Sequence, residues 1–190
     1  MECSKQFEPP LNIINLYGAQ ESRLSVENIK ENWEAILKEM IDIKAREENC
    51  VLIGDVNRHV GDIIPGNHDK TSPGGKLLLD LIHTGEYALV NALGVAAGGP
   101  FTRYDINDPD NDDKKSAIDL VVVSSALVPF IETLQIDNKL NWTPYRVNQG
   151  KLKYPDHYTM ILTFKEIPIR NLKLIPNQKH MIWNTKGRES

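Results

Sequence analysis

An aspartate and an asparagine stand one residue apart at the end of a short apolar run, in the stretch CVLIGDVNRH. The run, residues 50–53, predicts a buried strand, and Asp55 and Asn57 follow it after a glycine. Alternate residues of an extended chain share a face, so we expect the carboxylate and the carboxamide to point the same way. Strand ends at a sheet rim are where α/β enzymes place chemistry, although the same residues are also ordinary turn composition. The pair is therefore either part of a catalytic site or a simple turn.

Three other strand ends carry polar residues of complementary chemistry. Tyr17 ends the apolar run LNIINLY and Arg23 follows it, Asp119 begins DLVVV, and Asp156 and His157 directly precede YTMILTF. Together with the first pair they offer a metal-ligating carboxylate, a general base, a histidine with a possible acidic partner, and donors to a phosphate. This combination favours a catalytic site over a set of unrelated turns.

The elements that must position these residues alternate between strands and helices. Apolar residues recur at three- and four-residue steps from Val26 to Ile41, which predicts a long helix ending near Asn49. A strand, helix, strand unit of this kind usually forms a parallel, right-handed pairing. We further predict a short helix at 76–83, a strand at 87–91, a hairpin of 101–104 with 118–123, a helical turn at 125–130, an edge strand at 131–136 and a last strand at 158–164.

The composition of the chain is that of one ordinary globular domain. The sequence has 190 residues, 41% hydrophobic and 25% charged, and no apolar run approaches the length of a membrane span. We predict a disordered tail at 1–10, a domain at 11–164, and a tail or linker toward a following domain at 165–190. Two cysteines far apart indicate reduced thiols and an intracellular location, nuclear or cytoplasmic.

Positive charge is concentrated late in a chain whose net charge is −4. Residues 139–153 hold four Lys or Arg and no acid, interleaved with Trp142 and Tyr145. A local basic and aromatic segment can contact phosphates while the rest of the protein stays acidic, and for Trp142 base stacking and a loop anchor both remain open. The predicted contacts to nucleic acid or phosphate are Arg23, Arg58, Trp142, Arg146, Lys151 and Lys153.

Two stretches invite other metal-site interpretations that their residues do not support. The acidic loop DINDPDNDDKKS lacks the central glycine and closing glutamate of an EF-hand, so we predict a solvated hairpin loop. The stretch GDVNRHVGDIIPGNHD is similar to a calcineurin-type metallophosphoesterase motif. Arg58 stands where that motif needs a bridging aspartate, so we expect His68 and Asp69 to be loop residues and His59 to neighbour the site.

Four motifs, NLYGAQESR, VLIGDVN, SAIDLVVVS and PDHYTMILTF, follow one another between about Leu11 and Phe164. In these motifs the chain resembles the endonuclease/exonuclease/phosphatase superfamily of metal-dependent phosphodiesterases. Within it the chain looks most similar to the apurinic-like endonuclease domain preceding the reverse transcriptase of non-long-terminal-repeat retrotransposons, through GGPFTRYDINDPD and IWNTKGRES. The resemblance implies an α/β fold: a two-sheet β-sandwich flanked by helices, in four αββα, DNase-like layers.

The resemblance also implies a role for each residue of the motifs. Asp55 would activate or orient the attacking water, and Asn57 would hold that water or the scissile phosphate. His157 would neutralise charge on the pentavalent phosphorane, oriented by Asp119 through its ring N–H.

The remaining implied roles concern the metal and the substrate. Asp156 would sit at a Mg²⁺ site that could also take Mn²⁺, Tyr17 would hydrogen-bond the phosphate, and Arg23 would contact DNA. The implied partners are DNA as substrate and a reverse transcriptase domain in a longer parent, with no membrane.

The chain departs from the family pattern at its start. The family's first strands supply an asparagine and a glutamate as ligands, and nothing upstream of Leu11 matches them. Pro155, Val56 and Arg103 stand where the family usually has a serine and two aromatic residues. One aspartate, Asp156, is a poor Mg²⁺ site by itself. We therefore expect a copy truncated at its N-terminus, with exposed edge strands.

Three functions follow as hypotheses. The first is a Mg²⁺-dependent DNA-nicking endonuclease of a retroelement with impaired activity. The second is a non-catalytic nuclease-like remnant or nucleic-acid-binding module, which the absent upstream ligands favour. The third is a phosphomonoesterase of the same superfamily, which the basic and aromatic segment makes less favoured than a DNA enzyme.

Overall fold

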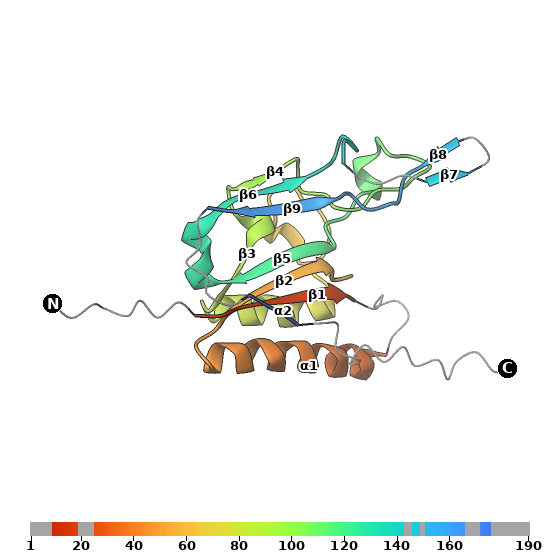
Figure 1. Cartoon of the computed structure of the whole chain (residues 1–190). Coiled ribbons are helices and arrows are strands. Elements are labelled where there is room, and N and C mark those ends of the chain that lie inside the picture. Colours follow the sequence, from red (N-terminus) through yellow and green to blue (C-terminus); the bar gives the residue numbers. More distant parts are fainter. Residues whose placement is uncertain (1–8, 19–24, 143–145, 149–150, 166–171, 176–190) are drawn as a thin grey trace.

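Two stacked β-sheets with helices on one outer side make up the body of the molecule (Figure 1). The computed structural model describes residues 9–18, 25–142, 146–148, 151–165 and 172–175. The larger sheet has five strands and the smaller has three. This is the two-sheet α/β architecture with flanking helices that the sequence predicted. No helix in the described part of the chain has the length and apolar character needed to cross a membrane.

The five-stranded sheet has the strand order β10-β1-β2-β5-β3. Strands β1 (Leu11–Tyr17) and β2 (Asn49–Asp55) are parallel, and β5 (Asp119–Ser124) is antiparallel to both β2 and β3 (Tyr87–Leu89). All six residues of β5 are buried, as expected for a central strand covered on both faces. The parallel β1–β2 pairing was predicted, and it ends with Tyr17 opposite Asp55.

Two amphipathic helices cover the outer face of this sheet (Figure 1). Helix α1 (Val26–Ala45) begins at Ser25, whose hydroxyl accepts a hydrogen bond from the Asn28 backbone, and it buries Trp33, Met40 and Ile43. Helix α2 (Pro73–His83) begins at Ser72, with proline at its first position. Both apolar stripes pack in one cluster with the β2 and β5 side chains Leu52, Leu120 and Val122.

The three-stranded sheet packs on the inner face of the larger one. Its order is β4-β6-β9, with β4 at Ala96–Ala97, β6 at Ile131–Ile136 and β9 at Met160–Phe164. Val121, Val123 and Leu134 are among the buried side chains that join the two sheets. We predicted β6 as an edge strand, and this was wrong because β4 and β9 pair with its two sides.

The remaining elements are short. They are the 3₁₀ turns η2 (Gly61–Ile63), η3 (Val90–Ala92), η4 (Asp112–Lys114) and η5 (Ser125–Phe130), the hairpin of β7 (Arg146–Asn148) and β8 (Lys151–Lys153), and β10 (Leu172–Ile175). The η5 turn confirms the helical turn predicted at 125–130.

Two further expectations fail. The hairpin expected of 101–104 with 118–123 is reduced to a single bridge, Arg103 with Ser116, because β5 pairs with β2 and β3 instead. Residues 172–175 were predicted as part of a tail, but they form β10, which lies parallel to the 11–14 half of β1. The edge that we expected to be exposed is therefore covered along that half.

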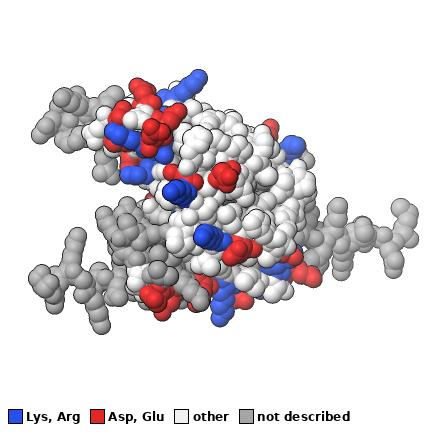
Figure 2. Space-filling model, turned by 180° about the vertical axis from the view of Figure 1, so that it is seen from behind, with Lys and Arg blue, Asp and Glu red and all other residues white. Residues whose placement is uncertain are grey.

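The acidic loop between Arg103 and Ser116 carries its own counter-charges. Lys114 Nζ lies 2.9 Å from Asp108 Oδ2 and 3.8 Å from Asp105 Oδ2, and Lys115 Nζ lies 2.8 Å from Asp112 Oδ1. Figure 2 shows red and blue side chains intermixed at its upper left, where the molecule of Figure 1 carries this loop. Asp105, Asp108 and Asp112 are thus paired with lysines, which fits the predicted solvated loop.

Candidate functional site

The ends of β1 and β2 approach each other closely at two glycines. The Gly18 N–H donates to the Asp55 carbonyl at 2.6 Å, and a Cβ on Gly18 would lie 2.1 Å from the Val56 carbonyl oxygen. Gly54 has φ of +140° and no room for a Cβ beside the Leu16 carbonyl. The glycine of the Gly-Asp-x-Asn motif therefore permits the close strand contact that sets Asp55 at the rim of the sheet.

Asn57 is fixed by the same junction. Its Nδ2 donates to the Gly18 carbonyl at 2.7 Å, and its backbone N–H donates to Asp55 Oδ1 at 3.0 Å. Its φ is +51°, in the left-handed region where asparagine is tolerated better than most residues. The motif is thus a strand-end turn that also orients the Asp55 carboxylate, and the catalytic role of the pair stays a prediction.

Asp55 and Asp119 face each other across the β2–β5 pair. The antiparallel register places the two aspartates directly opposite. Like charges at directly opposed positions destabilise a sheet. Such a pair is therefore better explained by a requirement for two carboxylates than by folding.

Buried polar groups hold Asp119 in place. Thr102 is fully buried, and its hydroxyl accepts from the backbone N–H groups of Ile118 at 3.1 Å and Asp119 at 2.9 Å. Asn91 donates to the Asp119 carbonyl at 3.2 Å and accepts from the Val121 N–H at 2.8 Å. The sequence analysis missed Thr102 and Asn91, because both partnerships cross the chain and leave no local pattern.

His157 completes the group from the segment just before β9 of the smaller sheet. Its Nδ1 lies 2.9 Å from Asp119 Oδ2, and its Nε2 lies 3.9 Å from both Asp55 Oδ2 and Asp156 Oδ1. The short contact assigns the Nδ1 proton to the bond with Asp119, which leaves Nε2 toward the two other carboxylates. The predicted histidine with an oriented acidic partner is therefore present in the geometry.

The charges of this group shift two pKa values upward. Burial raises the pKa of Asp55, and the adjacent Asp119 carboxylate raises it further. Burial disfavours the charged form of His157, but the hydrogen bond and charge of Asp119, with the charges of Asp55 and Asp156, outweigh it and raise the pKa of His157. The group thus contains a carboxylate more basic than usual beside a histidine that holds its proton more tightly than usual.

The chemistry of the donor set fits a divalent cation. Among the residues that the structure describes, the possible metal ligands are Asp55, Asp119 and His157, whose donor atoms lie within 4.8 Å of one another. Two opposed carboxylates, one of which has a pKa raised by the other, are stabilised by a cation between them. Carboxylate oxygens suit Mg²⁺ or Mn²⁺.

Asp156, which we predicted to sit at the metal, has another cation beside it. Its Oδ2 accepts from Arg103 Nε at 3.0 Å, and it lies outside the group of possible ligands. Arg103 is the main functional candidate that the sequence analysis did not assign. Its only local signal was that an arginine stands where the resembled family usually has an aromatic residue.

The other predicted contacts fall in different surroundings. Tyr17 at the end of β1 and Trp142 after β6 are each 50% exposed. Arg58 is 2% exposed, donates from Nη1 to the Asn57 carbonyl at 2.9 Å, and lies over the Trp33 ring at 5.7 Å from its centroid. A buried guanidinium has no surface for a phosphate, so Arg58 stabilises the loop under the site instead.

The remaining predicted residues lie where less is described. The β7–β8 hairpin contains Arg146, Lys151 and Lys153, and Arg23 lies outside the described residues.

Cys50 is fully buried, and burial raises the pKa of its thiol to about 12, so the thiol is unreactive and serves only in packing.

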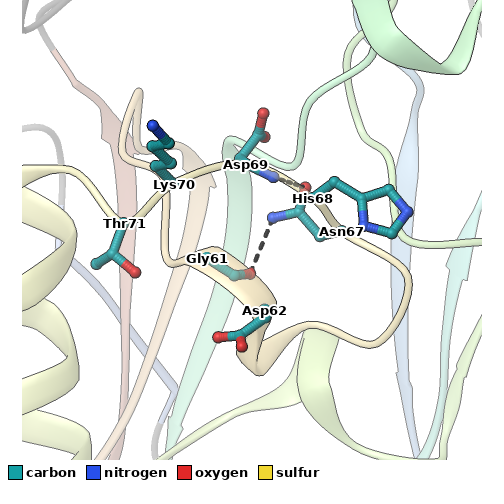
Figure 3. A pocket seen from close by; sticks show the side chains of 7 residues that line it. All are labelled: Gly61, Asp62, Asn67, His68, Asp69, Lys70 and Thr71. Atoms are coloured by element: carbon teal, nitrogen blue, oxygen red, sulfur yellow. Dashed lines mark hydrogen bonds between the residues drawn. The ribbon is translucent and has the colours of Figure 1, made fainter.

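A shallow cavity of about 400 Å³ lies in the loop that follows Asn57 (Figure 3). The Asn67 side chain is 2% exposed and donates to the Gly61 carbonyl at 3.0 Å, while Asp69 Oδ2 lies 3.0 Å from His59 Nδ1. None of Asp55, Asp119 and His157 lines this cavity. Asn67 and Asp69 thus bond within the loop, and His68 and Asp69 are loop residues, as expected.

The fold is the DNase-like α/β fold of the solved structures that it matches. The 3′-5′ exonuclease NExo from Neisseria meningitidis matches with a TM-score of 0.59 at 20% identity, over 81% of this chain and 61% of that chain. A second structure, of 3′ phosphatase NExo from Neisseria bound to a product DNA hairpin, matches with 0.59 at 19% identity over the same shares, 81% and 61%.

An AP endonuclease from Archaeoglobus fulgidus matches with a TM-score of 0.58 at 14% identity, over 82% of this chain and 62% of that chain. The chain therefore spans about three fifths of the length of these three structures. No protein-family model and no curated protein sequence matches the chain. At these identities the likeness establishes the fold.

Proposed function

We propose that this chain is a metal-dependent phosphodiesterase that hydrolyses DNA, with Asp55, Asp119 and His157 as its catalytic centre. One observation carries the proposal: His157 Nδ1 is bonded to Asp119 while its Nε2 faces Asp55 across 3.9 Å. A base and an oriented histidine on opposite sides of one small space are what an attack on a phosphate requires.

The residues divide the reaction between them. Asp55, with its raised pKa, accepts a proton from the attacking water as the oxygen bonds to phosphorus. The protonated His157 presents its Nε2–H to the charge that develops on the phosphoryl oxygens, and Asp119 keeps the ring in that orientation. The bond from phosphorus to the 3′ oxygen breaks, and that oxygen takes up a proton from the solvent, which leaves a 3′ hydroxyl and a 5′ phosphate.

Asp55 and Asp119 would hold a divalent cation, which would supply positive charge to the phosphate oxygens and the attacking water. Asn57 orients Asp55 through its backbone N–H, whether or not a cation is present. In this proposal Tyr17 donates to the phosphate, which its half-exposed position opposite Asp55 in the β1–β2 register supports.

DNA is the substrate that the surroundings favour. Trp142 is half exposed, and it lies in the stretch 139–153 that has four basic residues and no acidic one. Exposed aromatic rings near cations bind bases by stacking and phosphates by charge. Two of the compared proteins are named for action on nucleic acids, the exonuclease and the AP endonuclease.

Two other functions remain as alternatives. A phosphomonoesterase is favoured by the second Neisseria structure, which is named as a 3′ phosphatase. A non-catalytic nucleic-acid-binding module is the function expected if no cation binds. A nicking role in a retroelement, beside a reverse transcriptase domain, is the most specific form of the proposal. It rests on the motif resemblance alone.

Nicking of supercoiled plasmid tests the proposal. Wild type should convert plasmid to the open circle with Mg²⁺ or Mn²⁺ and not with EDTA. His157→Ala should lower this rate by roughly 10²–10⁴-fold, as the loss of a general acid or base does. His83→Ala is the matched control, because His83 is exposed at the end of α2.

The outcomes separate the three functions. Metal-dependent nicking lost in His157→Ala and kept in His83→Ala supports the phosphodiesterase. A folded chain that releases phosphate from a 3′-phosphorylated oligonucleotide without nicking plasmid is a phosphomonoesterase. A folded chain that does neither with either metal contradicts catalysis and leaves the binding module.

A further inference from the structure

Arg103 and Asp156 form an ion pair at the open side of the candidate site. Arg103 Nε donates to Asp156 Oδ2 at 3.0 Å, and the two side chains are 43% and 39% exposed. Exposed ion pairs contribute little to stability, typically about 0–1 kcal/mol. Fold stability is therefore a weak reason for an arginine at this position.

The backbone holds Arg103 beside His157. Arg103 and Ser116 exchange N–H to carbonyl bonds of 2.9 and 3.0 Å, and Arg103 forms a second bridge with His157. The Tyr104 N–H donates to the Asp156 carbonyl at 2.9 Å. The backbone of Arg103 is thus held in place next to the predicted catalytic histidine.

Two neighbouring tyrosines pack the segments of Arg103 and His157 against each other. Tyr104 and Tyr158 stack with 4.6 Å between ring centroids, and their exposed fractions are 3% and 8%. One follows Arg103 and the other follows His157 in the chain. A buried stack between the two segments limits how far the guanidinium and the imidazole can move apart.

Most of the guanidinium remains available to a ligand. Within the described part of the chain, Asp156 is its only ion-pair partner, and the bond uses Nε. A guanidinium has five N–H donors in a planar fork, so both Nη groups are left for an acceptor. Planar forks of this kind match the oxygens of a phosphate better than a lysine does.

Asp156 lies between the two cations of this side. Its Oδ2 bonds to Arg103, and its Oδ1 lies 3.9 Å from His157 Nε2. A phosphate that binds at His157 Nε2 therefore lies near the Arg103 guanidinium, because both cations contact the same carboxylate. Asp156 fixes the direction of the fork through Nε.

We infer that Arg103 is a phosphate-binding residue, whose Nη groups donate to a non-bridging oxygen of a DNA phosphate, and that Asp156 is its positioning residue. The inference rests on the proposed function, because it takes a DNA phosphate as the ligand. It assigns Asp156 to the arginine, in place of the metal-ligand role that the motif resemblance implied.

Binding of a short fluorescein-labelled DNA duplex in EDTA, followed by anisotropy, tests this without catalysis. Arg103→Gln should weaken binding about tenfold, the loss expected for one hydrogen bond to a charged group. Its slope of log affinity against log salt should be smaller by about 0.9, the value for one phosphate contact. Arg103→Lys should lose less of the affinity, because it keeps the charge and not the fork.

Arg46→Gln is the matched control. Arg46 is an exposed arginine after α1 that pairs with Glu39 and Glu48. Its substitution removes the same charge as Arg103→Gln, but away from the site. Arg103→Gln binding with wild-type affinity and slope, or Arg46→Gln losing as much, would overturn the inference. Absence of DNA binding by the wild type would overturn it too.

The two proposals fail separately. A wild type that nicks plasmid, with an Arg103→Gln variant equal to it in binding and in rate, refutes the role of Arg103 alone. A wild type that binds DNA through Arg103 and never cleaves it refutes the catalytic proposal alone.

Discussion

The two sides of the candidate site are built differently. On the inner side Asp119 is 8% exposed and is bonded to His157 at 2.9 Å, with Thr102 and Asn91 fixing its backbone. On the outer side Asp156 and Arg103 are 39% and 43% exposed and hold each other by one bond. One aspartate is buried and pairs with a partly buried histidine, and the other pairs with an arginine at the surface.

Asp156 and His157 are neighbours in the chain, yet His157 belongs to the inner side and Asp156 to the outer side. A buried carboxylate shifts the pKa of its neighbours, because low solvation strengthens every charge interaction. An exposed carboxylate has little such effect, yet it can direct a cation toward a ligand. We therefore expect inner-side variants to lose reaction rate and outer-side variants to lose binding affinity.

Asp55→Asn should show the largest effect. Without a carboxylate to accept the proton, the cleavage rate at saturating DNA should fall by roughly 10²–10⁴-fold, while the Kd for DNA in EDTA stays near the wild-type value. Single-turnover cleavage measures the rate, and Asp80→Asn on the exposed side of α2 is the charge-matched control. If Asp55→Asn lost affinity and kept its cleavage rate, the assignment of rate to the inner side and of affinity to the outer side would be wrong.

Thr102→Val should destabilise the fold. The substitution leaves the buried N–H groups of Ile118 and Asp119 without their acceptor, so the free energy of unfolding should fall by about 1–3 kcal/mol. Urea denaturation measures it. Thr133→Val is the control: Thr133 is half buried and makes one longer bond of 3.3 Å to the Val95 carbonyl. Equal losses would mean that the inner side is not specially supported.

Trp142→Ala should weaken DNA binding and leave the rate at saturation unchanged. A stacked base contributes about 1–3 kcal/mol by alanine substitution. Anisotropy with single-stranded and duplex DNA measures the loss. Ile41→Ala serves as the control, because Ile41 is an equally exposed apolar side chain on α1, 54% exposed against 50%. Unchanged affinity would leave Trp142 as a loop anchor.

The pH profile should respond to the inner side alone. Activity needs Asp55 deprotonated and His157 protonated, so it should fall when pH drops through the pKa of Asp55 or rises through that of His157. Burial raises the pKa of Asp55, and the Asp119 carboxylate raises it further. Burial lowers the pKa of His157, but the hydrogen bond and the charge of Asp119 outweigh burial and raise it. In Asp119→Asn both limbs should move to lower pH, and Arg103→Gln should leave the profile unshifted. Rates across pH decide this.

Local patterns were enough for much of the fold. The apolar run 11–17 ending in glycine marks β1 fully, and the three- and four-residue spacing of apolar side chains marks α1. Alternation does not say which strand is the partner. For that reason the run 118–123 was paired with 101–104 when its actual neighbours are β2 and β3, and β10 was not expected beside β1.

The candidate site was predictable where a motif carried it and not where contacts did. Asp55, Asn57, Asp119 and His157 stand at strand ends, and the strands bring them together as the motif order implied. The burial of Arg58 depends on Trp33 in a distant helix, and the pairing of Asp156 depends on an arginine 53 residues away. No short stretch of sequence contains either relation.

Single-turnover DNA cleavage by Asp119→Asn, His157→Ala and the double variant tests the catalytic centre most directly. Asp119 orients the ring of His157, and that contribution is already lost when the ring is removed, so the loss in the double variant should be smaller than the product of the two single losses. Losses that multiply, or single variants that cleave at the wild-type rate, would contradict a centre built on this pair.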